Sequence, residues 1–233
     1  MFPGFSPDAL TFLRSLKRNN RREWFQPRKE IFETKLKTPM VQLVEAINAE
    51  LLDFAPEHIT DPKKAVYRIY RDTRFSADKT PYKTHIAAIF PDRNLGKQSA
   101  AGFYFHLTDK SVGIAAGSYM PGPDELRAIR AWLAENHAAF RKASRGPQKL
   151  LGKLEGSAVT RMPKGFDAAH PAEDLIRMKQ WLYWVELDAK IATTPRLLPE
   201  LVKRFRAAAP VIAMLNAPLR KNAPKSPTAT YPA

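Results

Sequence analysis

The middle of the sequence carries successive β-patterned runs with no helical pattern between them. Thr84–Phe90 is rich in β-branched and aromatic residues, Gly102–Leu107 alternates apolar with polar side chains, and Val112–Tyr119 follows after the polar turn TDKS. The last two runs, joined by so short a turn, predict a hairpin. A further alternating run, Ala65–Arg71, precedes them. Strands that follow one another without intervening helices pair antiparallel, so the sequence predicts a β-meander and not βαβ units.

Helical patterns come before the predicted strands. Ser6 and Thr38 each stand directly before a proline, which is a typical helix start. Asn20 stands three residues before Glu23, a spacing that predicts a capping box at the start of another helix. The first sixty residues are therefore predicted to be helical.

Helices return after the predicted strands. The patterns indicate a helix over Pro123–Ala143, a short strand near Ala158–Met162, a helix that Pro171 opens and that runs through Leu182, and a last amphipathic helix over Pro195–Leu215. The predicted class is α+β, with an antiparallel β-meander packed against several amphipathic helices. Its N-terminal third and its C-terminal part are helical.

The chain is predicted to form one domain over residues 1–217, because no linker or internal repeat interrupts that stretch. Residues 218–233 are basic, contain several prolines and have no core-forming pattern. They are predicted to form a disordered tail.

Composition limits the possible functions. The sequence has no cysteine, which excludes disulfides, thiolate catalysis and cysteine-ligated metals. It has no apolar run long enough to span a bilayer and no signal-peptide pattern at its start, so we expect a soluble cytoplasmic protein with no membrane partner. The common nucleotide-binding, zinc-protease and serine-hydrolase motifs are absent, and no cofactor is predicted. The formal net charge of +15 favours anionic partners, either small molecules or nucleic acid.

The stretch RIYRDTRFSADKTPYK (residues 68–83) concentrates charge beside the predicted strands. If it begins as a strand, Arg68 and Arg71 point to opposite faces. Burying an unpaired guanidinium is costly, so at least one of the two should pair with an aspartate of the segment or with an external anion. After Asp72 the pattern becomes that of an ordered turn.

These charges form the predicted anion site. Arginine supplies forked donors for phosphate or carboxylate, lysine supplies a point charge, and tyrosine can stack or form a hydrogen bond. The predicted ligand-binding residues are Arg68, Arg71, Arg74, Lys79, Tyr82 and Lys83, and the candidate catalytic residues are Asp72, Asp78 and His106. The alternative is that Arg–Asp pairs only make a long connection rigid, although surface ion pairs are worth only ~0–1 kcal/mol each.

The histidines give no metal-binding spacing. His85 and His106 lie on predicted strands and can approach one another across the sheet. A metal there would need carboxylate partners, for which Asp72 and Asp78 are the nearby acids. Half-buried, hydrogen-bonded histidines are the commoner arrangement, and no metal is predicted.

A second charged element, NNRREWF (residues 19–25), admits two interpretations. Arg21 and Arg22 at a helix start can contact an anion together with free backbone N–H groups. Otherwise the segment is a capped helix whose Trp24 and Phe25 enter the core, which is the interpretation that the sequence favours.

Four stretches together, NNRREWF, RIYRDTRFSADKTPYKTH, AGFYFHL and RMPKGFDAAHP, resemble a widespread family of bacterial and fungal domains of unknown function. That family carries N-N-x-x-x-W-F near its start and R-x-Y-R-D-x-R-F-S-x-D-K-x-P-Y-K in its middle, and the resemblance covers roughly residues 3–190. It implies joint importance for Arg68, Arg71, Asp72, Arg74, Asp78, Lys79, Tyr82 and Lys83. It implies no reaction.

Three functions remain open on the sequence alone. The first is a pocket that binds an anionic small molecule through the 68–83 segment, with or without catalysis. The second is a basic module that associates with nucleic acid and stacks bases on aromatic residues such as Phe103 and Tyr104. The third is an interaction scaffold without a ligand. The sequence does not indicate an oligomeric state.

Overall fold

A four-stranded antiparallel sheet lies at the centre of the protein, in a computed structural model that describes residues 2–95 and 100–222. Its strands are β1 (Ile86–Phe90), β2 (Gly102–Leu107), β3 (Ser111–Ser118) and β4 (Trp181–Asp188). Each strand pairs with the next one along the chain, in the order β1-β2-β3-β4. The predicted meander and the predicted hairpin of β2 and β3 are confirmed.

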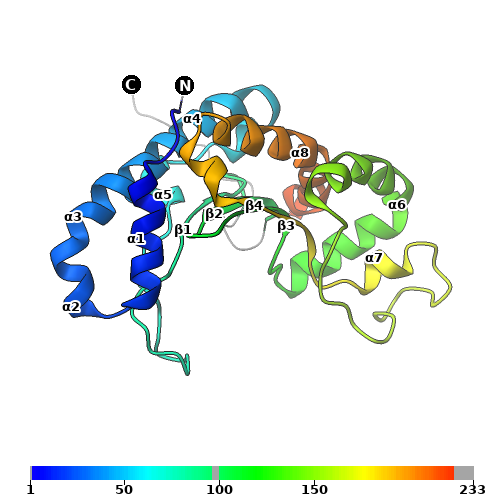
Figure 1. The fold of residues 1–233 in the computed structure, drawn as a ribbon. Coiled ribbons are helices and arrows are strands. Elements are labelled where there is room, and N and C mark those ends of the chain that lie inside the picture. The colour runs from blue at the N-terminus through cyan, green and yellow to red at the C-terminus, as the bar shows by residue number, and fades with distance from the viewer. Residues whose placement is uncertain (1, 96–99, 223–233) are drawn as a thin grey trace, which may run out of the picture.

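Helices precede and follow the sheet, as predicted for an α+β protein (Figure 1). Before it come α1 (Pro7–Arg18), α2 (Arg22–Phe25), α3 (Lys29–Phe32), α4 (Thr38–Phe54) and α5 (Pro62–Ala65), with single-turn helices at Gln26–Arg28, Glu33–Lys37 and Pro56–His58. Between β3 and β4 lie α6 (Pro123–Leu151) and α7 (Glu173–Arg177). A 3₁₀ turn at Ala189–Thr193 leads into α8 (Leu197–Asn222).

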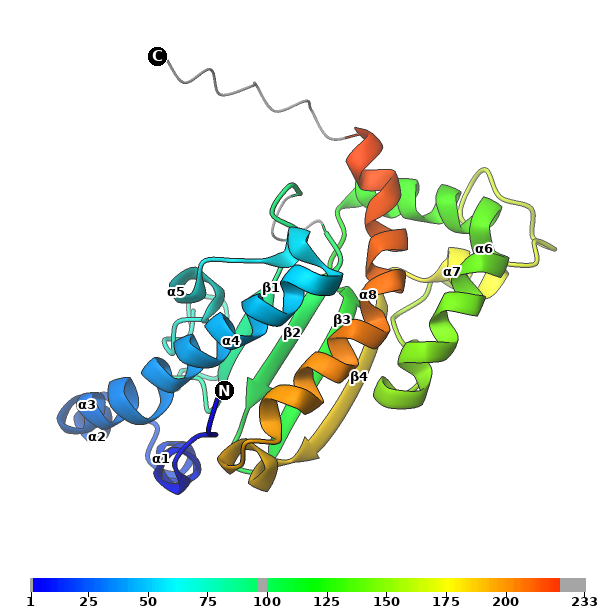
Figure 2. The same ribbon diagram turned by 90° about the horizontal axis from the view of Figure 1, so that it is seen from above.

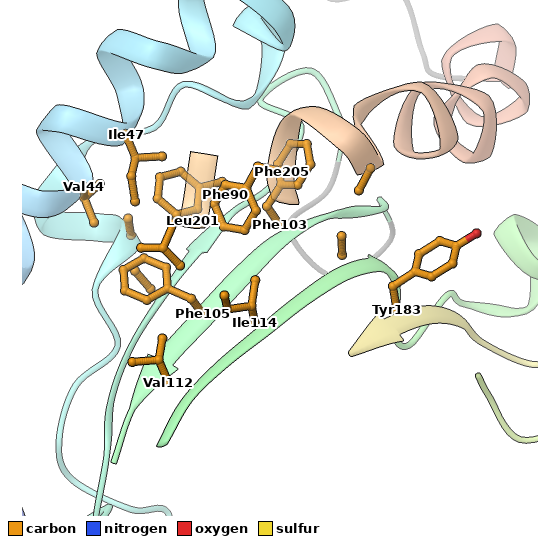
Figure 3. Close-up of a cluster of buried hydrophobic side chains, with 14 of the residues drawn as sticks. Val44, Ile47, Phe90, Phe103, Phe105, Val112, Ile114, Tyr183, Leu201 and Phe205 are labelled. Atoms are coloured by element: carbon orange, nitrogen blue, oxygen red, sulfur yellow. The ribbon is translucent and has the colours of Figure 1, made fainter. Parts of the chain in front are cut away.

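The hydrophobic core lies between one face of the sheet and the helices α4 and α8, which run side by side across it (Figure 2). Side chains alternate between the faces of a strand, so Phe103 and Phe105 of β2 point to the core with their partners on β1 and β3. Phe205 of α8 stacks on Phe103 with ring centroids 4.8 Å apart, and Ile47 of α4 lies in the same cluster (Figure 3). This packing fixes which side chains remain on the opposite face.

The stretch that follows Pro171 differs from its prediction. The helix ends at Arg177, and Trp181 begins β4, so the prediction of one helix through Leu182 is wrong. Residues 181–188, WLYWVELD, pair with all eight residues of β3. The indole N–H of Trp181 also donates to the carbonyl of Leu175 at 3.1 Å. Tertiary pairing therefore overrides the helical spacing of the apolar residues here.

Two further predicted strands are present only as isolated bridges. Val66 pairs with Ala88 beside β1, and Ala158 pairs with Met178 beyond the start of β4. The first bridge lies at the β1 edge of the sheet, the second lies outside the four strands, and neither segment forms a regular strand. At the C-terminus α8 continues through Pro218 to residue 222, with Leu219 buried, and the rest of the predicted tail lies outside the described residues.

Candidate functional site

The charges at the tip of the 68–83 segment, called here the charged hairpin, neutralise one another. The Arg74 guanidinium donates to both carboxylate oxygens of Asp72, at 3.0 and 2.8 Å, and Arg71 pairs with Asp78. These hydrogen bonds lower the pKa of each aspartate to about 2. Lys79 donates to a backbone carbonyl of the same loop at 2.9 Å. The tip is therefore a set of internal ion pairs and not a converging anion pocket.

Tyr82 anchors the charged hairpin to the N-terminal helices. The Asn20 side chain donates to the Tyr82 carbonyl at 2.8 Å and accepts from the Tyr82 N–H at 3.0 Å. The Tyr82 ring is only 1% exposed and stacks on Phe25 with centroids 4.2 Å apart. Tyr82 is thus a core residue that no ligand can reach.

The same contacts correct the prediction for residues 19–25. Arg21, not Asn20, is the N-cap of α2, and no side chain caps the helix, so the predicted capping box is wrong. Asn20 uses its amide on the hairpin instead. Phe25 is buried and Trp24 is half-buried against the core, as the favoured interpretation expected.

The sheet face opposite α4 and α8 carries the other candidate surface, called here the open face. No helix among the described residues covers it in Figure 1, where the charged hairpin and the loop before α7 descend on either side. Strand register places two rows of residues that span all four strands on this face, flanked on β4 by Leu182 and Asp188. One row is Ile89, Tyr104, Ala115 and Trp184, and the other is Ala87, His106, Gly113 and Glu186.

Five rings form a continuous strip across the open face. Tyr67 contacts Tyr104 edge-on at 6.4 Å between centroids, and Tyr104 lies 5.7 Å from His106. His106 in turn lies 5.3 Å from His85 and 5.4 Å from Trp184. Tyr67 and Trp184, at the two ends of this ring strip, are 38% and 39% exposed. The expected approach of His85 to His106 is therefore present, within a larger aromatic surface.

Gly113 allows the rings to lie flat on the sheet. A Cβ atom at Gly113 would come within 2.5 Å of the His106 ring and 2.7 Å of the Trp184 ring. Any side chain on β3 at this position would lift both rings away from the strand. The glycine thus serves the ring strip and not a turn.

One cation of the charged hairpin, Lys83, stands beside the ring strip. The Lys83 ammonium lies 5.0 Å from the centroid of the Tyr67 ring. Partial burial, together with the charge of Arg68, lowers the pKa of Lys83. Within residues 2–95 and 100–222 the ion pairs of the hairpin are those of Arg71 and Arg74, and neither Arg68 nor Lys83 has one.

The histidines of the ring strip are neutral at pH 7. Burial, with smaller contributions from His106 and Lys83, lowers the pKa of His85 to about 4. Burial also lowers the pKa of His106, against the opposing charge of Glu186. Burial raises the pKa of Tyr104 to about 12, so its hydroxyl stays protonated, and it lies 3.2 Å from Nδ1 of His106.

We expect the stability of the protein to fall between pH 6.5 and about 4 because of His85. The pKa of His85 is lower in the folded chain than in the unfolded chain, so the unfolded chain takes up the proton first. Since the ring is only partly buried, we expect His85 to contribute about 1–2 kcal/mol to this loss, less than the full shift would give. Denaturant unfolding of the wild type and His85→Gln at several pH values measures it. Parallel pH curves for the two proteins would contradict the prediction.

A cavity of about 820 Å³ borders residues 66–70, where the chain enters the charged hairpin. Its lining is mainly apolar, from Phe25, Phe32, Val41, Val66 and Ile69, with cations from Lys29, Lys37, Lys63 and Arg68. Lys37 pairs with Glu33 at 2.9 Å. Arg68 thus lines this cavity and is also close enough to Lys83 for its charge to lower the pKa of that lysine.

Among the described residues, Glu57, His58 and Asp92 are the one group of possible metal ligands that lie close together, within 4.8 Å. Arg220 of α8 already places its guanidinium there, 2.6 Å from Asp92 and 3.1 Å from Glu57. A cationic side chain therefore balances these carboxylates. The Nδ1 atom of His58 is 3.0 Å from the carbonyl of Phe90 and ties the ring to the end of β1.

The structure separates the predicted site residues into three groups. The members of the first group bind one another or the hairpin backbone and are Arg71, Asp72, Arg74, Asp78 and Lys79. Tyr82 is in the core. Lys83 and His106 lie at the open face, and Arg68 lines the neighbouring cavity close enough to Lys83 to lower its pKa. Tyr67 and Trp184 were not among the site residues predicted from the sequence. The aromatic and β-branched residues of WLYWVELD were the available signal for a strand that carries Trp184, but the stretch was interpreted as a helix.

The fold and these contacts define an α+β protein with an antiparallel sheet covered by helices on one face and lined by rings on the other. The model of a family described as "Conserved hypothetical protein (DUF2461)" matches residues 8–214, and the chain belongs to that family. The resemblance seen in the sequence is thereby confirmed. Comparison with curated proteins and with solved structures gave no match. In the part of the chain that the structure describes, no helix has the length and apolar character needed to cross a bilayer.

Proposed function

We propose that the protein binds an anionic ligand, bearing phosphate or carboxylate, where the base of the charged hairpin meets the open face. The observation that carries this proposal is the position of Lys83. Its ammonium is partly buried, lies over the Tyr67 ring and is near a second cation, Arg68, while no carboxylate pairs with it among the described residues. An anion would relieve this repulsion.

The electrostatics of the neighbouring residues support the same site. The acids of the charged hairpin bind Arg71 and Arg74, which leaves them unable to neutralise Lys83. His106 is neutral, and its Nδ1 is within hydrogen-bond distance of Tyr104. With Tyr104 as the donor, His106 carries its proton on Nε2 and can donate it to a bound anion.

This arrangement changes the assignment of candidate catalytic residues. Asp72 and Asp78 are held as carboxylates by arginines at the hairpin tip. His106 is the candidate that lies on the ligand-facing surface, and it would act on the ligand as a hydrogen-bond donor or acid. Any chemical reaction of the ligand in this proposal would therefore depend on His106 alone.

Substitution of Lys83 tests the binding site. We expect Lys83→Ala and Arg68→Ala each to weaken the binding of inorganic pyrophosphate or citrate on the order of tenfold, as removal of one charge-assisted contact does. Isothermal titration calorimetry at low salt measures the affinity. Lys79→Ala is the matched control, because its ammonium binds a carbonyl of the hairpin tip, and it should bind as the wild type does.

Two outcomes would overturn the proposal. One is that Lys83→Ala retains full affinity for both anions while Lys79→Ala loses it, which would move the site to the hairpin tip. The other is that the wild type binds neither pyrophosphate nor citrate at low salt.

A further inference from the structure

We propose that the ligand of the open face is single-stranded nucleic acid, with its bases stacked along the ring strip and a phosphate at Lys83 and Arg68. This proposal rests on the proposed function, since it places a nucleic-acid phosphate in the same anion site. It adds the chemical class of the ligand and a role for rings that the anion site alone does not use.

The length of the ring strip exceeds that of one small ligand. The strip begins at Tyr67, beside β1, and ends at Trp184 on β4, so it crosses the segment at residue 67 and all four strands. Neighbouring strands lie about 4.8 Å apart, which makes the strip about 19 Å long. Four-stranded sheets that bind RNA on an aromatic face stack two or three bases.

The residues that surround the rings favour nucleic-acid bases as the groups that stack on the strip. Its rings alternate with small residues, Ala115 beside Tyr104 and Trp184, and Gly113 beneath His106. A base would therefore meet the rings themselves, which already fill the space above Gly113. Base–aromatic stacking tolerates any sequence, which suits a surface that offers few directed donors.

Charge complementarity favours a polyanion. The chain has a formal net charge of +15. At one end of the strip, Lys83 and Arg68 are unneutralised within the described residues. Strand register places two acids, Glu186 and Asp188, on the face itself, both at the β4 side and away from Lys83. A strand of nucleic acid would thus run from the cationic end of the strip toward Trp184.

Fluorescence anisotropy with labelled oligouridylate and oligothymidylate of about eight nucleotides tests the inference. We expect binding that weakens steeply between about 50 and 200 mM salt. Trp184→Ala should weaken it on the order of tenfold, and Trp184→Phe, which keeps a ring, should largely preserve it. Phe75→Ala is the matched control, because Phe75 is an aromatic residue of the hairpin tip, 94% exposed and away from the strip.

The outcomes distinguish this inference from the proposed function. Equal binding of an abasic strand and a base-bearing strand, or an unchanged affinity in Trp184→Ala, would overturn base stacking. So would binding of pyrophosphate without binding of either oligonucleotide. In each of these cases the anion site would stand if Lys83→Ala still lost pyrophosphate. If Lys83→Ala bound every tested anion as tightly as the wild type, the proposed function itself would be overturned.

Discussion

Tyr82→Ala should lower the free energy of unfolding by about 4 kcal/mol, within the range measured for removing a buried aromatic ring. The ring is 1% exposed, stacks on Phe25 at 4.2 Å and lies 5.4 Å from the Tyr70 ring. Its removal would open a cavity between the charged hairpin and α2, where the Tyr82 ring now stacks on Phe25. Urea unfolding measures the change in free energy, and thermal unfolding should show a melting temperature lower by about 10 °C.

Phe75→Ala is the control for Tyr82. Both are aromatic residues of the same hairpin, but Phe75 is 94% exposed, so its loss should change stability by less than about 0.5 kcal/mol. Asn20→Ala should fall between the two, because it leaves the Tyr82 N–H and carbonyl without their partners. If Tyr82→Ala instead unfolded like the wild type and lost pyrophosphate binding, Tyr82 would be a ligand contact after all.

The class of the fold was predictable because short-range patterns determine it. Three β-patterned runs follow one another in sequence with no helix between them, and a short turn joins the second run to the third. β4 was not predictable in the same way. The apolar residues from Leu175 to Leu182 have a helical spacing that competes with the β-forming residues of WLYWVELD. Pairing with β3, about seventy residues earlier, selects the extended conformation.

The candidate site was predictable only in part, for a related reason. The charges of the 68–83 segment are visible in the sequence, but the sequence does not show which arginine pairs with which aspartate. Arg71 and Arg74 are neutralised within the hairpin, whereas Lys83 is not. The sequence also offered Phe103 beside Tyr104 for stacking. Strand alternation sends Phe103 into the core and Tyr104 to the open face, and helix packing decides which face is which.

Arg220→Ala should destabilise the protein by about 3 kcal/mol, at the lower end of the range for breaking a buried ion pair. Asp92 has no exposed surface, and the Arg220 guanidinium is its cationic partner at 2.6 Å. Without Arg220, the Asp92 carboxylate would stay buried beside Glu57 with no positive charge to balance it. We expect less than the full penalty because Arg220 itself is 39% exposed, so water reaches part of the pair.

Arg206→Ala on the same helix separates this effect from a general loss of charge on α8. Arg206 pairs with Asp53, whose side chain is 72% exposed, and lies over the Phe54 ring, so its removal should cost less than about 1 kcal/mol. Asp92→Asn added to Arg220→Ala should recover much of the stability, because the penalty arises from the unpaired carboxylate. Urea unfolding of the four proteins measures these differences. Equal effects of Arg206→Ala and Arg220→Ala, or no recovery in the double variant, would show that the buried carboxylate does not require its partner.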